Sequence, residues 1–428
     1  MKWLLDTTNA LLLVVIVLVL LVLVQARCYH TAPVPPEPPV TGACDAADVA
    51  AGAANCPRLE QSALVYVGGF RMPLDGADWS YAQYGGMDLN AAKTGLYVSN
   101  GYWLCEVNIP DLINHADPNF LPVAQWTQAC VRPGDGQLEK DMGTSDIKLG
   151  SPLLFGQYVV QSTYWYFDSA GAQVKTHFRH SPTLATTGAY KGLATMTVAP
   201  AKEAGWISTI MGHVTPEWRV ALGGPALAGG GGIPIIDRQP YGFSLYSFDP
   251  AQVNVVEPVP TTMLMGHDDT HKLGEWGAQS NVWNGSSVYH GIAMINGTRV
   301  TLVAGFHGTG PWCYGDGGTA PSDGQRCYDP TIPAHGTHAY PYVYRLWAFD
   351  TREMAEVKAG KREAWNVKPY GNWDITLPTP SCCPILMGLA YDDAKQLLYL
   401  MQAKVHGFDH SLSAVHAFRV TVPVTKRG

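Results

Sequence analysis

A short pattern of a glycine, an apolar strand, a polar turn and a second apolar strand recurs along the chain. The copies are YGGMDLNAAKTGLYVSN, YKGLATMTVAPAKEAGWISTIMG, YHGIAMINGTRVTLVAG and LMGLAYDDAKQLLYLMQ. Their glycines lie about 100 residues apart, at Gly86, Gly192, Gly291 and Gly388. Short apolar runs bounded by turn residues are typical of strands, so the pattern predicts a repeated β-hairpin.

A second pattern is an aromatic strand that ends in Phe-Asp. It occurs as STYWYFD up to Asp168, FSLYSFD up to Asp249 and YRLWAFD up to Asp350. A Gly-led hairpin followed by an aromatic outer strand is what each blade of a β-propeller supplies. The repeated units cover residues 64–132, 145–180, 188–260, 285–370 and 385–422. We therefore expect an all-β fold, a single β-propeller of about five blades, with six or seven left open because the third unit could split.

The last unit has too few strands of its own, and we expect the strand at residues 63–69 to complete it and close the ring. Closure removes the unpaired edges that an open sheet must protect. In these repeats the chain after Ser62 resembles β-propeller repeat proteins. The stretches TPEWRVALGGPAL and GTHAYPYVYRLWAFD are similar to uncharacterised bacterial secreted propeller proteins. This resemblance implies the architecture and carries no activity with it.

The composition agrees with a large folded chain rich in strands. Of 428 residues, 46% are hydrophobic and 15% are charged, which supplies a core and excludes a disordered chain. The 45 Gly, 31 Pro, 21 Tyr and 13 Trp favour short strands and tight turns over long helices. The formal net charge of −7 leaves no basic excess to neutralise a phosphate backbone, so we expect no nucleic-acid partner.

The amino terminus has the pattern of an export signal. Residues 10–24 are apolar, Lys2 precedes them, and Ala26 is a small residue at the expected cleavage position. Residues 1–26 are therefore predicted to be a signal peptide, with an uncleaved membrane anchor as the alternative. An anchor would be the only predicted contact with a membrane. Residues 27–61 are expected to form a Pro/Ala-rich spacer and residues 62–428 the propeller.

Nine cysteines in an exported chain favour disulfides and a secreted, periplasmic or cell-surface location. Spacing alone does not determine connectivity, so free buried thiols are the alternative. The expected local pairs are Cys44 with Cys56, Cys105 with Cys130, and Cys313 with Cys327.

A histidine follows the second strand in three units, at His213, His307 and His406. Each could tie the turns of its blade together through backbone hydrogen bonds. The three could instead converge on a metal, as in the histidine-metal sites of some propeller lyases. A stabilising contact is needed in every blade whereas a catalyst is needed once, so repetition favours the structural role.

The loop LMGHDDTHKLGEW is a candidate site for a divalent metal, either calcium or a transition metal. The candidate ligands are His267 and His271 in this loop and His290, which precedes a repeated glycine. Solvated turn residues are the alternative, because Gly266 and Gly274 disfavour the helix that would align the two loop histidines.

The insertion at residues 310–342 is a candidate ligand surface, held by the expected 313–327 disulfide. Trp and Tyr stack on sugar rings, and Asp supplies hydrogen bonds or calcium ligands. A surface loop that fills space between blades is the alternative. The candidate ligand-binding residues are Trp312, Tyr314, Asp316, Asp323, Tyr328, His335 and His338.

Two functions follow from these features. The sequence contains no Gly-rich phosphate loop, no G-x-S-x-G turn and no HExxH motif, so nucleotide, serine-hydrolase and zincin functions lack support. The leading hypothesis is an exported or cell-surface module that contacts polysaccharide or another protein through loops on one face. The alternative is a metal-assisted polysaccharide lyase or hydrolase that uses some of the histidines named above. The sequence leaves open whether the protein is an enzyme.

Overall fold

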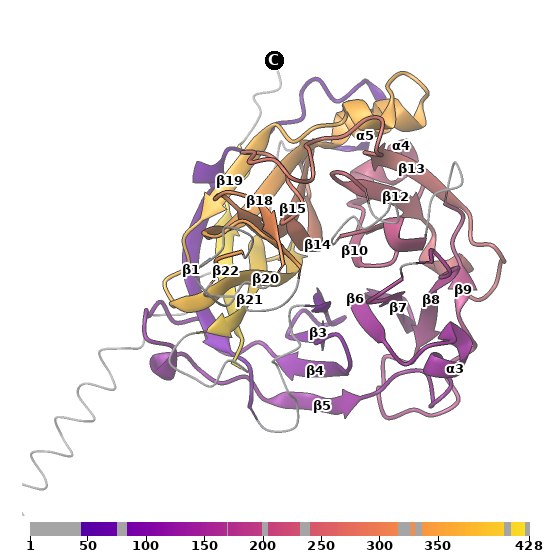
Figure 1. The fold of residues 1–428 in the computed structure, drawn as a ribbon, viewed down its shortest axis with the longest axis vertical. Coiled ribbons are helices and arrows are strands. Elements are labelled where there is room, and N and C mark those ends of the chain that lie inside the picture. The colour runs from indigo at the N-terminus through magenta and orange to yellow at the C-terminus, as the bar shows by residue number, and fades with distance from the viewer. Residues whose placement is uncertain are drawn as a thin grey trace, which may run out of the picture. The chain divides into compact units, whose positions relative to one another are not determined.

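The computed structural model describes residues 44–74, 84–168, 170–198, 204–231, 240–315, 327–329, 336–405 and 412–423. In these residues the strands form five four-stranded antiparallel sheets and one two-stranded sheet. The five large sheets surround a common centre as blades, and the view in Figure 1 looks down the axis of the ring. The expected five-bladed β-propeller is confirmed.

The blades follow one another along the chain. Blade 1 contains β2 (Gly86–Leu89), β3 (Gly95–Ser99), β4 (Leu104–Asn108) and β5 (Trp126–Val131). Blade 2 contains β6 (Ile147–Phe155), β7 (Tyr158–Trp165), β8 (Lys175–His180) and β9 (Ala194–Thr195). Blade 3 contains β10 (Ile210–His213), β11 (Ala226–Gly229), β12 (Ser244–Phe248) and β13 (Thr261–Gly266). Blade 4 contains β14 (Val288–Ile295), β15 (Val300–Gly308), β18 (Tyr342–Asp350) and β19 (Gly371–Ile375).

Blade 5 joins the two ends of the described chain. Its first three strands are β20 (Ser381–Asp392), β21 (Leu397–Val405) and β22 (Ala414–Val420), and its outer strand is β1 (Leu64–Arg71). β1 pairs antiparallel with β22, from Leu64 opposite Val420 to Arg71 opposite Ala414. The expected closure of the ring by the early strand is therefore confirmed.

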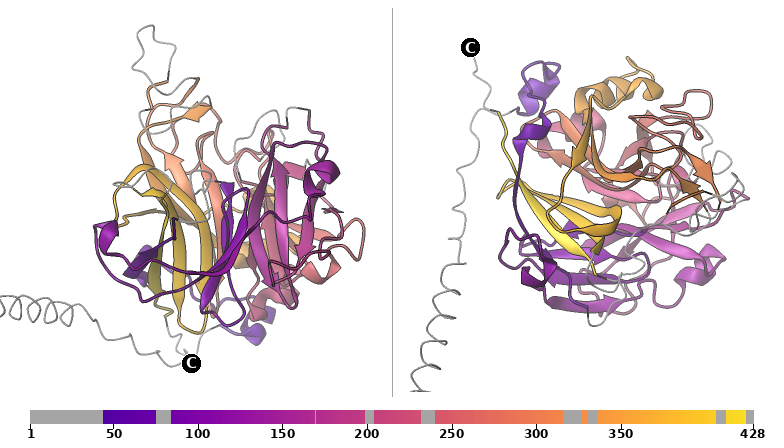
Figure 2. Two further views of the ribbon diagram at one scale, coloured as in Figure 1. Left: turned by 90° about the horizontal axis from the view of Figure 1, so that it is seen from below. Right: turned by 60° about the vertical axis from the view of Figure 1, so that its left-hand side comes forward.

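Short helices and one small sheet lie in the segments that connect or precede the blade strands. The α-helices are α2 (Ala46–Ala50), α3 (Leu138–Met142), α4 (Arg219–Leu222) and α5 (Thr351–Lys358). The 3-10 turns are η1 (Gln61–Ala63), η3 (Pro118–Phe120), η4 (Ala204–Trp206), η5 (Pro216–Trp218), η6 (Pro250–Gln252) and η7 (Ala364–Asn366). Strands β16 (Cys313–Tyr314) and β17 (Thr337–His338) belong to the insertion, which extends from one end of the ring (Figure 2). We call this the insertion end. The opposite end, where the first and second strands of the blades are joined, is the hairpin end.

Apolar side chains fill the seams between neighbouring blades. In the seam of blades 3 and 4, Phe243 lies 5.2 Å from Trp347 and 5.0 Å from Phe349, measured between ring centroids in edge-to-face contacts. Tyr289 of β14 lies 4.7 Å from the same phenylalanine. Such pairs add to the large apolar area that aromatic residues bury, so this seam is a principal part of the core.

Each first strand contains a glycine at its closest approach to the first strand of the next blade. The five are Gly86, Gly150, Gly212, Gly291 and Gly388. A Cβ atom placed on Gly212 would lie 2.7 Å from the carbonyl oxygen of Ile292, and one on Gly291 would lie 2.5 Å from the amide nitrogen of Leu389. In the same way the other three meet Ser151, Thr209 and Met87. These contacts run around the whole ring. At four seams a Cβ atom would lie within 3.0 Å of backbone, and at the fifth it would lie 2.8 Å from the Met87 side chain.

This ring corrects one part of the predicted repeat. Gly192, expected to begin an inner hairpin, precedes β9, the outer strand of blade 2. It has a φ of +89° and open space around its Cα, so it is a turn glycine. The equivalent inner glycine of blade 3 is Gly212. The segment after Gly192 resembles the inner hairpins in sequence because an outer strand such as β9 is also short and apolar.

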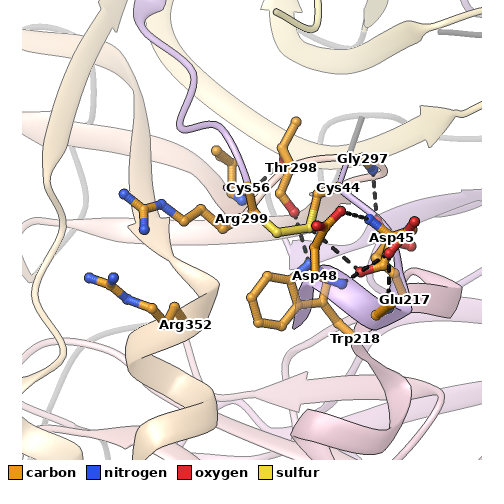
Figure 3. The surroundings of a disulfide bond; sticks show 12 residues. Cys44, Asp45, Asp48, Cys56, Glu217, Trp218, Gly297, Thr298, Arg299 and Arg352 are labelled. Carbon is orange, nitrogen blue, oxygen red and sulfur yellow. Dashed lines mark hydrogen bonds between the residues drawn. A yellow bond between two sulfur atoms is a disulfide. The ribbon is translucent and has the colours of Figure 1, made fainter. Parts of the chain in front are cut away.

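The segment at residues 44–61 forms a clasp on the hairpin end. The Cys44–Cys56 disulfide closes a loop that contains α2, and the Asp45 side chain caps this helix by accepting from the amides of Ala47 and Asp48. The clasp binds the β14–β15 turn, because the Cys44 amide donates to Gly297 O at 3.0 Å (Figure 3). The Arg299 amide donates to Pro57 O, also at 3.0 Å.

The neighbouring η5 turn also forms hydrogen bonds with the β14–β15 hairpin. Trp218 Nε1 donates to Thr298 O at 2.8 Å, and Glu217 Oε1 accepts from the Gly297 amide at 2.7 Å (Figure 3). Residues 44–61 are thus part of the packed structure, whereas the sequence places the start of the folded region at Ser62. The spacer prediction misses this because the clasp buries few side chains, which are Val49, Ala53, Leu59 and its two cysteines.

All three expected disulfides are present, joining Cys44 to Cys56, Cys105 to Cys130, and Cys313 to Cys327. Within the described ranges, no helix is long and apolar enough to cross a membrane. The predicted signal or anchor at residues 1–26 lies outside those ranges.

Replacing Gly291 with Ala should lower the free energy of unfolding by about 1 to 3 kcal/mol, because the new methyl group meets backbone that cannot move away. Gly277→Ala is the matched control, since its Cβ would meet only the Trp312 ring at 3.4 Å. Urea denaturation of both variants measures the difference. Equal midpoints would show that the seam tolerates a side chain.

Replacing both Cys44 and Cys56 with Ser should release the clasp and cost about 2 to 3 kcal/mol of stability, because the closed loop is short. Limited trypsin digestion offers a local measurement, since Arg58 lies in the clasp and is held by Asp350 at 2.7 Å. We expect faster cleavage after Arg58 in the double variant. Cleavage at the wild-type rate would mean that packing alone holds the clasp.

Candidate functional site

A cavity of about 300 Å³ lies on the axis at the hairpin end. The first strands of all five blades line it, together with the turns that follow them. Its apolar wall is formed by Met87, Leu154, Met211, Ile292, Met294 and Leu389. Its polar lining includes Asp88, Lys93, His213, Arg219, Asn296 and Tyr391. The cavity therefore combines apolar walls with charged groups, as ligand sites in proteins commonly do.

A carboxylate and an imidazole from different blades meet in this cavity. His213 Nε2 lies 2.9 Å from Asp88 Oδ2. The same oxygen accepts from the Leu154 amide at 2.7 Å, and Oδ1 accepts from the Leu89 amide at 2.9 Å. Asp88 is buried, but 45% of the His213 side chain is open to the cavity. The pair is thus held by blades 1, 2 and 3 and presents its imidazole to a ligand.

The surroundings favour the protonated form of His213. Its deep position lowers its pKa, but the charge of Asp88 and the hydrogen bond to it outweigh this effect, so the pKa lies above its ordinary value. The positive charges of Arg219 and Lys93 act in the opposite direction and moderate the rise.

Among the described residues that line the cavity, Arg219 is a cation that forms no ion pair, although its charge acts against the burial that raises the pKa of Glu217. Lys93 pairs with Asp393 and lies 3.7 Å from Asp392. Arg219 donates from Nε to Val214 O at 3.3 Å, and no carboxylate of the described residues lies within ion-pair distance of it. An anionic group on a ligand would complete this arrangement.

The three predicted metal ligands do not come together. His267 is buried, with Nδ1 at 3.0 Å from Phe243 O, and His290 is buried with no hydrogen-bond partner on Nδ1. His271 stacks on Trp365 at 3.8 Å and bonds Asp268 at 3.0 Å on an exposed loop. Among the residues that the structure describes, no group of three His, Cys, Asp or Glu side chains is arranged to hold a metal. The loop forms no helical turn that would align His267 and His271, as Gly266 and Gly274 indicate.

The repeated histidines have different surroundings. His307 is fully buried, with Nδ1 at 2.8 Å from Ser287 Oγ and Nε2 at 2.7 Å from Ser280 O, so it ties β15 to the loop before β14. His213, assigned the same structural role from the sequence, instead faces the axial cavity and bonds a carboxylate of another blade. His406 lies outside the described residues.

The insertion places two of its predicted binding residues on the surface. Tyr314 is 59% exposed and Tyr328 is 51% exposed, and Trp312 packs on Trp276 with 6.1 Å between ring centroids. His338 cannot serve as a surface ligand, because it is buried between Asp329 Oδ2 at 3.0 Å and Gly315 O at 2.9 Å. The remaining candidates, Asp316, Asp323 and His335, lie outside the described residues.

Asp88 and Arg219 were not predicted from the sequence as site residues. Asp88 occupies the second position after its strand's glycine, where two other copies have Ala293 and Ala390. A carboxylate in place of alanine was the available signal. No comparable signal distinguishes Arg219, which reaches the cavity only because the η5 turn and α4 follow β10.

Comparison with known proteins leaves the function open. No protein-family model matches the chain, and no curated protein matches its sequence. A luciferin-regenerating enzyme is 10% identical with a TM-score of 0.34, and the match covers 79% of each chain. A mutant α-L-arabinanase of Cellvibrio cellulosa is 10% identical with a TM-score of 0.40, over 77% of this chain and 89% of that one. A glycosyl hydrolase from Bacteroides ovatus is 10% identical with a TM-score of 0.40, over 85% and 92%. Such scores add nothing to the fold already evident from the strands.

Burial should make the protein sensitive to mild acid. Burial lowers the pKa of five histidines, to about 3 for His177 and His416 and to about 4 for His267, His290 and His307. The unfolded chain takes up these protons near pH 6.5, whereas the folded protein does not, so stability falls as the pH drops from about 6.5 towards 4. His213 has a raised pKa and opposes this trend, but it is one group against five.

We expect the free energy of unfolding in urea to fall by about 2 kcal/mol between pH 7 and pH 5 for each histidine that stays neutral. His307→Asn should reduce this pH dependence by one proton relative to the wild-type protein. The same free energy at pH 7 and pH 5 in the wild-type protein would contradict the buried neutral state.

Proposed function

We propose that the protein is an exported β-propeller whose axial cavity binds a small ligand with an apolar body and an acidic or hydroxyl head. The observation that carries this proposal is the His213–Asp88 pair, open to a cavity that all five blades line. The volume of about 300 Å³ lies at the lower end of the range for ligand sites in proteins, which supports a small molecule.

Different lining residues suit the polar head and the apolar body of the proposed ligand. Arg219 is a hydrogen-bond donor with positive charge, which suits a carboxylate or an oxygen-rich head, and the open His213 imidazole adds a second hydrogen-bonding group. Met87, Met211 and Met294 are flexible apolar side chains from three blades, which suit an alkyl or aryl body.

Export is supported by the disulfides. Three disulfides are rare in a reducing cytoplasm, so a secreted, periplasmic or cell-surface location fits them best. This extends the expectation from the apolar amino-terminal run.

A second candidate function is surface binding of polysaccharide or protein at the insertion end. It is favoured by the exposed Tyr314 and Tyr328, which lie next to the Cys313–Cys327 disulfide. Tyr340 forms an edge-to-face pair with Tyr328 at 6.2 Å. Exposed aromatic rings on a braced loop can stack on sugars. A metal-assisted lyase has less support, because the predicted ligands lie apart.

Titration of the full chain with straight-chain carboxylates from acetate to octanoate tests the axial site by calorimetry. Affinity should rise about fourfold for each added methylene until the apolar wall is covered. Arg219→Gln should weaken binding at least tenfold by removing the charge, and Lys361→Gln, an exposed control that does not line the cavity, should not. No binding of any member of the series, or equal binding by both variants, would overturn the proposal.

A further inference from the structure

His213 differs from the other described histidines that pair with a carboxylate. The His338–Asp329 pair is closed to solvent, and the His271–Asp268 pair lies on an exposed loop where the imidazole stacks on Trp365. Only the His213–Asp88 pair, among the described residues, combines a carboxylate partner with an open face in a cavity. An imidazole in this situation can exchange protons with a bound molecule.

The hydrogen bonds of Asp88 determine which ring nitrogen is available. Its two oxygens accept from the Leu89 amide, the Leu154 amide and His213 Nε2. Asp88 Oδ2 lies within hydrogen-bond distance of Nε2 and accepts a hydrogen bond from it, so in the neutral imidazole the proton sits on Nε2. Nδ1 of His213 then carries the free lone pair, and it has no hydrogen-bond partner among the described residues.

We infer that His213, positioned by Asp88, acts as a general base that activates water for the hydrolysis of a small carboxylic ester in the axial cavity. The inference rests on the proposed function, since it needs a ligand in this cavity. Water is the nucleophile because the lining hydroxyls are not placed for attack: Thr215 is buried and the Tyr391 hydroxyl donates to Asn296 at 3.0 Å.

Hydrolysis of the ester by this route needs only water and His213. His213 Nδ1 takes a proton from water as the water oxygen bonds to the carbonyl carbon, and the carbonyl oxygen becomes an oxyanion. The oxyanion then collapses, the bond to the alcohol oxygen breaks, and the imidazolium returns its proton to that oxygen. The products are a carboxylic acid and an alcohol, with no change in oxidation state.

The charged lining favours an ester over a glycoside. Arg219 forms no ion pair with a carboxylate of the described residues, and its guanidinium can stabilise the oxyanion. Glycoside hydrolysis ordinarily needs two carboxyl groups across the scissile bond. The cavity has Asp88, which is fully engaged, and Asp393, which pairs with Lys93. One base and one cation suit a carbonyl substrate.

Hydrolysis of p-nitrophenyl butyrate by the full chain tests the inference. His213→Gln keeps an N–H donor for Asp88 and should lower kcat at least about 100-fold, whereas His271→Gln, the matched exposed imidazole, should keep the wild-type rate. Arg219→Gln should lower kcat through loss of oxyanion stabilisation. Equal rates for His213→Gln and wild type would overturn the inference.

Asp88 is a positioning residue, and the pH profile separates that role from a purely structural one. In the wild type, kcat/KM should rise with pH and level off above pH 6.5, because the carboxylate raises the His213 pKa. In Asp88→Asn the rising limb should move to lower pH. If Asp88→Asn lowered the melting temperature but left the rising part of the kcat/KM profile at the wild-type pH, Asp88 would only join the blades.

Butyrate binding keeps the two proposals distinguishable. Binding of butyrate without hydrolysis of the ester above the buffer rate would overturn the hydrolase and leave the ligand site in place. The absence of both would overturn the proposed function itself.

Discussion

The architecture depends on the approach of five inner strands to within backbone contact of one another. At each seam a glycine of one first strand faces the first strand of the next blade, and a Cβ atom there would overlap it. Because β1 closes the ring by pairing with β22, the blades cannot spread to relieve an overlap at one seam without opening another. Tight packing at the axis and closure of the ring therefore act as a single constraint. Aromatic side chains fill the space that remains between neighbouring blades farther from the axis.

The same constraint places the cavity. Several of the residues that line it directly follow the glycines, as Met87 follows Gly86 and His213 follows Gly212. Beyond the glycines the first strands carry side chains again, and these line the cavity. The axial site is thus built from regular strands that closure holds rigid, rather than from loops. Rigid elements position reacting groups more accurately than loops do.

The sequence predicted what depends on local pattern. Five units, the closing strand and the three disulfides could be inferred because each rests on a repeated segment or on short cysteine spacings. It failed where contacts join distant positions. Asp88 and His213 are 125 residues apart, and no local pattern in either segment indicates that the two side chains are in contact. His213 and His307 occupy equivalent positions in the repeats. His213 faces the cavity, whereas His307 is buried and hydrogen-bonded to Ser287 and Ser280. Gly192 matched because an inner and an outer strand share one apolar pattern.

The repeat also argues against a purely structural role for the buried carboxylate. Asp88 occupies a position that is alanine in blades 4 and 5, where Ala293 and Ala390 line the same cavity. The seams therefore close without a charge at this level. A buried carboxylate is costly unless it is fully hydrogen-bonded, and an apolar replacement of a buried charge is often no less stable. Three N–H donors satisfy Asp88, two of them from blades 2 and 3. An arrangement so complete, at a site where alanine suffices for the fold, is better explained by the imidazole that it orients than by the blades that it joins.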